Sequence, residues 1–143
     1  MTITPLAFLN DGVPLATDED LKKEHPRIVN DLWQGETSYV DQLSKAWDLL
    51  SIDLKKKGYD PTLVSNSTAN IAWAKEAVIQ KAFAIIFRDF FDESGDKWHL
   101  LMEAHAAEYQ SYIDAETIDY DLDEDGTVSD DEEGIHIVTR FSR

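Results

Sequence analysis

Apolar residues recur at helical spacing in three long segments of the chain. The first covers residues 37–57 and ends in three lysines, followed by Gly58 at the position of a helix-ending glycine. The second covers residues 67–90, and its apolar surface is wide enough for a central helix packed on two sides. The third covers residues 97–113, after the break at 94–96. The stripe of the first segment consists of Tyr39, Leu43, Ala46, Trp47, Leu50 and Leu54.

The N-terminal part of the chain is less regular. Residues 1–16 show no sustained period and predict an extended arm. Its apolar residues indicate that the arm packs either on its own domain or on a neighbouring subunit. Thr17, followed by acids, predicts a helix start, and Pro26 ends or kinks that helix before a second short helical turn over 27–33.

The C-terminal part divides into two segments of different character. Residues 117–133 form an acidic loop, and residues 134–143 are rich in β-branched side chains, which predicts a strand or an extended tail. We therefore expect an all-α protein, a compact bundle of three to four helices over residues 17–116. The arm precedes this helical domain, and the acidic loop and the tail follow it.

Charge is concentrated in one segment. The 143 residues contain 13 Lys+Arg and 29 Asp+Glu, for a net charge of −16. Eleven of the acids lie in residues 114–133, where there is no basic residue. This balance argues against binding to nucleic acid or to an anionic membrane surface, because both need clustered lysines and arginines. The only tight basic run is 55–57, which we interpret as a helix C-terminus.

The acidic segment contains a twelve-residue motif of the EF-hand type. Oxygen ligands for Ca²⁺ fall at positions 1, 3, 5, 7, 9 and 12 of residues 121–132, with a glycine, Gly126, at position 6 for the sharp turn. The position 7 ligand is a backbone carbonyl, and the position 12 ligand is a bidentate glutamate. The predicted ligands are Asp121, Asp123, Asp125, Thr127, Ser129 and Glu132.

The flanks of this motif differ from a paired EF-hand. Gly134 and a β-branched run follow Glu133 at once, and no second loop is present in the sequence. A calcium sensor works by changing the angle between two helices, so these flanks favour a structural calcium clip over a sensor. The alternative is an acidic, solvated segment that matches the motif through its composition.

No other pattern in the sequence indicates catalysis or a second metal site. The chain has no Cys, which excludes thiolate nucleophiles and cysteine-ligated metals. We interpret His105, on an apolar stripe, as a hydrogen-bonded core histidine, and His99 with Glu103 as a surface helix pair. The sequence contains no glycine-rich phosphate loop and no nucleophile elbow, so we expect no enzymatic activity.

The order of these elements resembles a known family. An arm leads to a long amphipathic helix, a Gly58–Pro61 turn, a long apolar helix, a helix carrying Tyr109, an Asp-Gly loop and an extended C-terminus. Over about residues 36–133, this order resembles the head–tail connector (adaptor, or head completion) proteins of tailed bacteriophages.

The resemblance implies a structural role in the virion neck. Subunits made in the host cytoplasm would form a ring, typically of twelve copies, that docks on the portal protein. The ring would extend the DNA channel without binding DNA specifically and would offer a platform to the next neck or tail protein. In this sequence the resemblance points to the C-terminal tail for portal docking, through Ile135, Ile137, Val138, Arg140, Phe141 and Arg143.

The acidity of the chain is consistent with this role. An acidic wall repels the phosphates of passing DNA, which suits a channel that must not bind the duplex.

The alternative function is a stand-alone calcium-binding protein, a buffer or regulator that uses the 121–132 loop. The chain has no stretch long enough to span a bilayer and no signal-peptide pattern at its start, so we expect no membrane association.

Overall fold

The protein is mostly helical, as the sequence predicts, with two small sheets added. A computed structural model describes residues 4–26, 28, 38–89, 96–115, 117–121, 124 and 126–136, without the side chains of 115, 130 and 136. Its described helices are α1 (Asp18–Glu24), α3 (Val40–Lys56), α4 (Thr68–Arg88) and α5 (Lys97–Ala115), with short 3₁₀ turns η1 (Pro61–Leu63) and η2 (Asp130–Glu132). The predicted helical turn over 27–33 falls outside the described residues, except for Ile28, which is helical and buried.

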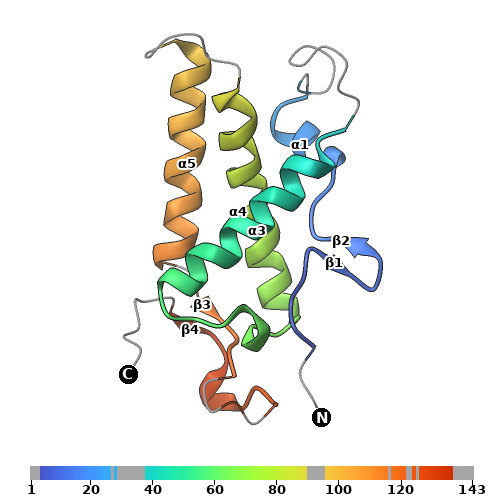
Figure 1. The fold of residues 1–143 in the computed structure, drawn as a ribbon, viewed down its shortest axis with the longest axis vertical. Coiled ribbons are helices and arrows are strands. Elements are labelled where there is room, and N and C mark those ends of the chain that lie inside the picture. Colours follow the sequence, from blue (N-terminus) through green and yellow to red (C-terminus); the bar gives the residue numbers. More distant parts are fainter. Residues whose placement is uncertain are drawn as a thin grey trace.

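Helix α4 is the centre of the molecule. Helix α5 packs along it, and α3 crosses it diagonally (Figure 1). Thirteen of its 21 residues are buried, which confirms the prediction of a helix packed on two sides. The fully buried side chains Phe83, Leu43 and Leu50 form part of one continuous core shared by the three long helices.

The helix ends follow from local sequence signals. Thr17 and Asp20 form a capping box at the start of α1, and Ser67 caps α4 by accepting a hydrogen bond from the Asn70 N–H. Helix α3 ends at the predicted glycine: Gly58 has φ +91°, and the Tyr59 N–H donates to the Leu54 carbonyl at 2.9 Å. This is a Schellman ending, in which the left-handed residue favours glycine.

Helix α3 begins later than predicted. We expected it to start near Thr37, but Ser38 and Tyr39 precede the helix, which begins at Val40. The reason is tertiary. The Tyr39 N–H donates to an Asp18 carboxylate oxygen at 2.7 Å, and the buried Tyr39 hydroxyl donates to the Ile28 carbonyl at 2.8 Å.

The N-terminal arm is a β-hairpin, which the sequence did not predict. Strands β1 (Leu9–Asn10) and β2 (Val13–Pro14) pair antiparallel around an Asp11–Gly12 turn in which both residues have positive φ. Such two-residue turns match the twist of a hairpin. Leu6, Phe8 and Leu15 are buried, so the base of the arm packs on its own domain, whereas the tip projects at one edge of the molecule (Figure 1).

The segment predicted as a plain acidic loop is partly built into the core. Strand β3 (Thr117–Ile118) pairs antiparallel with β4 (Ile135–His136), so the segment predicted as a strand or extended tail begins with a short anchored strand. The rest of that segment, residues 137–143, lies outside the described residues. Ile118 and Tyr120 are buried, and Tyr120 bridges to Val64. The apolar residues of 117–120 override the acidic composition around them.

Candidate functional site

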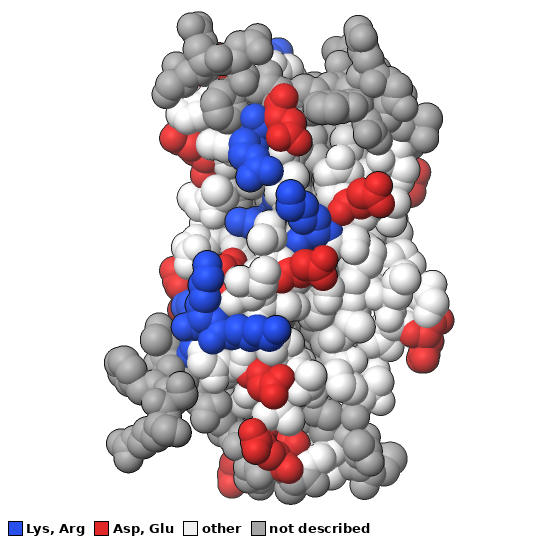
Figure 2. All heavy atoms as spheres, viewed as in Figure 1, with Lys and Arg blue, Asp and Glu red and all other residues white. Residues whose placement is uncertain are grey.

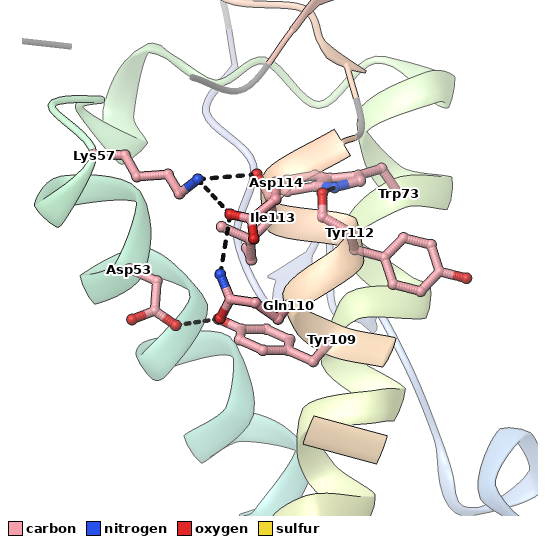
Figure 3. Close-up of polar contacts among 8 residues, drawn as sticks. All are labelled: Asp53, Lys57, Trp73, Tyr109, Gln110, Tyr112, Ile113 and Asp114. Carbon is pink, nitrogen blue, oxygen red and sulfur yellow. Dashed lines mark hydrogen bonds and ion pairs between the residues drawn. The ribbon is translucent and has the colours of Figure 1, made fainter. Parts of the chain in front are cut away.

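The candidate site is the acidic loop that begins where α5 ends, and contacts between α3 and α5 fix its starting point. The Lys57 ammonium lies 2.7 Å from an Asp114 carboxylate oxygen, and the Tyr109 hydroxyl donates to Asp53 at 2.5 Å (Figure 3). Burial, together with the Asp53 carboxylate, raises the pKa of Tyr109 above its usual range, so this hydroxyl stays protonated. The last lysine of the basic run therefore pairs with the first acid of the acidic segment.

Hydrogen bonds of the Asn70 side chain also attach the loop to the start of α4. This asparagine is fully buried; its amide nitrogen donates to the carbonyls of Ser65 (2.7 Å) and Asp119 (2.9 Å), and its oxygen accepts the Asp119 N–H at 2.9 Å. Asp119 in turn accepts hydrogen bonds from the Ser67 hydroxyl and the Gly134 N–H. Sequence reasoning missed Asn70 and Asp119. The signal for Asn70 was a polar residue in the first turn of an apolar helix. Asp119 was one of eleven acids in its segment, so nothing distinguished it from the others.

The first and last acids of the predicted calcium loop both turn inward. Asp121 is fully buried and Glu132 is 3% exposed. Burial of two carboxylates is unusual for acids that serve only to solvate a loop. The Asp121 carboxylate accepts the Gly126 N–H at 2.9 Å, and Gly126 has φ +86°, so the sharp turn at position 6 has formed.

The other end of the loop closes on Ser129. This serine starts η2 with a capping box, in which both its N–H and its hydroxyl donate to one Glu132 carboxylate oxygen at 2.9 Å. The Tyr120 N–H donates to the Glu132 carbonyl at 3.0 Å, so a backbone hydrogen bond connects the two ends of the loop. Positions 1 and 12 are therefore brought to the same part of the fold.

Of the six predicted ligands, four are described and two are not. Asp121, Thr127, Ser129 and Glu132 belong to the loop just outlined, while Asp123 and Asp125 lie outside the described residues. Within the described part of the chain, no cluster of three or more His, Asp or Glu residues is arranged to hold a metal ion. The hard oxygen donors at positions 1 and 12 and the formed turn fit Ca²⁺, and calcium binding stays a prediction.

The predicted docking residues lie mainly beyond the described chain. Ile135 is in β4, half-buried and packed against the core. Ile137, Val138, Arg140, Phe141 and Arg143 lie outside the described residues, and their docking role stays a prediction.

A second polar cluster links α1 to α4 and α5. The Nε2 atoms of His25 and His105 are 3.0 Å apart, His105 Nδ1 is 2.6 Å from Gln80 Oε1, and Gln80 Nε2 is 3.2 Å from a Glu24 carboxylate oxygen. A carboxylate only accepts, so the Gln80 nitrogen faces Glu24 and its oxygen accepts from His105 Nδ1. Neutral His105 then accepts at Nε2 from the His25 N–H. The predictions of a hydrogen-bonded core His105 and of a His99–Glu103 pair, at 3.2 Å, are confirmed.

Comparison with protein-family models, with curated proteins and with solved structures finds no match for this chain. None of the described helices is both long and apolar enough to cross a membrane.

Proposed function

We propose that the protein is a structural adaptor of a phage neck, whose copies form a ring beneath the portal and join head to tail. The supporting observation is the placement of the hairpin tip and of strand β4. The hairpin tip projects at one edge (Figure 1), and β4 is held against β3 so that the last seven residues start from a fixed point. Both are arrangements suited to contact with other chains.

Sequencing the genes that flank this one, followed by co-assembly with any portal protein encoded among them, tests the adaptor role. We expect the chain to co-sediment with preformed portal rings, and we expect the double variant Arg140→Ala, Phe141→Ala to lose at least tenfold in affinity, because it lacks the apolar anchor and one charge. Val40→Ala is the matched control, since Val40 is an exposed apolar residue on α3. If the wild-type chain does not bind portal rings, or both variants bind equally well, the proposal fails.

A second candidate function, calcium binding by residues 121–132, is favoured by the inward-facing Asp121 and Glu132. When bound, the ion would replace carboxylate repulsion in the loop with coordination. In the adaptor it would act as a clip that fixes the exit of the tail; in the alternative, the chain would be a stand-alone buffer or regulator.

We expect Ca²⁺ at a hundredfold excess over its dissociation constant to stabilise the protein by about 2.7 kcal/mol, measured by thermal unfolding. Asp121→Asn retains an oxygen for the Gly126 N–H but removes a ligand charge, so it should abolish most of this gain. The control is Asp131→Asn, at the non-ligand position 11, where the side chain is exposed. An equal response in both variants would indicate counterion screening instead of a site.

A further inference from the structure

The tip of the β1–β2 hairpin exposes apolar side chains on both of its faces. Leu9 pairs with Pro14, and Asn10 pairs with Val13. Cross-strand partners lie on the same face and successive residues on opposite faces, so Leu9 and Val13 stand on opposite sides of the hairpin. They are 60% and 65% exposed, the highest values among the large hydrophobic residues described as exposed. A surface that contacts both must enclose the tip.

A groove of suitable character lies on another part of the same molecule, between α3, η1 and the start of the arm. Its volume is about 350 Å³, and its apolar walls are Pro5, Leu6, Trp47 and Pro61. A second hollow of about 360 Å³ shares Lys55, Asp60 and Pro61 with it and extends it past the end of α3. The two hollows share these three lining residues and so lie next to each other at the end of α3.

Charge distinguishes the tip from the groove. The tip carries the exposed acid Asp11 in its turn. The groove is bordered by the exposed Lys55, with the exposed Lys56 beside it, and the Asp60 carboxylate in the groove is held by the N–H and hydroxyl of Thr62. On the face shown in Figure 2, basic side chains gather on the side of α3, interspersed with acidic ones, while the hairpin side shows acidic side chains and no basic ones among the described residues.

We propose that the hairpin tip of one copy docks in this groove of a second copy. Leu9 and Val13 contact the apolar walls, and Asp11 lies beside Lys55. A charge of −16 on each copy opposes association, and this contact places an acid of one copy on the basic run of the next. The tip and the groove are different surfaces, so the contact is head-to-tail and repeats into a ring when the rotation closes. The inference deepens the proposed ring and rests on that function.

Disulfide trapping tests the contact cleanly because the chain contains no Cys. Val13→Cys supplies a thiol on the tip, and Ser51→Cys supplies one in the groove with little change in size. The two proteins are mixed at high concentration and mildly oxidised, and the three possible dimers are separated. We expect the mixed tip–groove disulfide to exceed each like-with-like disulfide at least fivefold.

The matched control replaces Ser51→Cys by Ser111→Cys, an exposed serine on α5 outside the groove. Ser111 is more exposed than the half-buried Ser51, so random collision would favour the control. A second pair reverses charge: Asp11→Lys and Lys55→Asp should each weaken self-association at least tenfold, and their mixture should restore it. Mixed disulfide no more abundant than in the control overturns the proposal.

Failure here can be distinguished from failure of the adaptor role. If the chain binds portal rings but the disulfides form without selectivity, the tip–groove contact is wrong and the adaptor role is still supported. A selective disulfide without portal binding would leave a self-assembling protein whose partner is not the portal.

Discussion

Replacing Asn70 with Ala is expected to destabilise the protein by about 3 to 5 kcal/mol, a large part of the 5–15 kcal/mol that holds a typical domain together. The side chain is fully buried and bonds to three backbone groups, the carbonyl of Ser65 and both the N–H and the carbonyl of Asp119. Each buried group left unsatisfied costs about 1–3 kcal/mol. Urea unfolding measures the loss as a lower midpoint at unchanged slope.

The comparison is Asn66→Ala, which removes the same atoms from a half-buried asparagine with one long hydrogen bond, 3.3 Å from the Asn10 side-chain oxygen. Its expected loss is about 1 kcal/mol or less. Hydrogen exchange in Asn70→Ala should also rise over residues 117–121, since Asn70 ties them to α4. A loss below 1 kcal/mol in Asn70→Ala would show that water replaces the amide without cost.

The sequence predicts those parts of the fold that local chemistry decides. The capping residues Thr17 and Ser67 and the glycine at Gly58 set helix ends within a few residues, and the apolar stripes of 37–57 and 67–90 identify the buried faces. The start of α3 departs from prediction because Asp18, twenty-one residues earlier, binds the Tyr39 amide. No local pattern encodes such a contact.

The candidate site divides in the same way. Spacing alone selects Asp121 and Glu132 and predicts the turn at Gly126. Both acids are buried and the turn is formed, and their role as ligands stays a prediction. The acidic composition of the segment gave no indication that Ile118 and Tyr120 are buried. Their burial makes this part of the predicted loop a part of the core. The anchor at Asn70 depends on a contact 49 residues away along the chain, which neither periodicity nor composition specifies. The hairpin was missed because residues 1–16 show no sustained period, although Asp11–Gly12 suits a two-residue hairpin turn.

The His25–His105 pair makes stability depend on pH above the range in which carboxylates titrate. Burial lowers the pKa of both histidines below the 6.5 of an exposed imidazole, and the charge of His25 lowers that of His105 further, while the nearby Glu24 carboxylate opposes both shifts. Gln80 and the rings of Phe83 and Phe87 also contact the pair, and Trp98 stacks on Phe87. Below pH 6.5 the unfolded chain therefore binds protons that the folded chain excludes, so stability falls as pH falls.

Complete exclusion of two protons would set an upper limit of about 2.7 kcal/mol per pH unit on this slope, and solvent screening at the half-buried His25 keeps the slope below it. We expect the free energy of unfolding to fall between pH 7 and 5.5, by at most about 2.5 kcal/mol, measured by urea unfolding at each pH. His25→Gln should roughly halve the dependence, whereas His99→Gln, at the surface pair with Glu103, should leave it intact. Carboxylates with a lowered pKa, such as Asp20 and Asp60, stabilise the folded protein until the pH falls to about 4. Their protonation therefore does not change the free energy of unfolding between pH 7 and 5.5. Constant stability from pH 7 to 5.5 would contradict this expectation. It would mean that both histidines are protonated without unfolding, each ring rotating to donate outward. The neutral His25–His105 hydrogen bond would then not be what holds α1 in place.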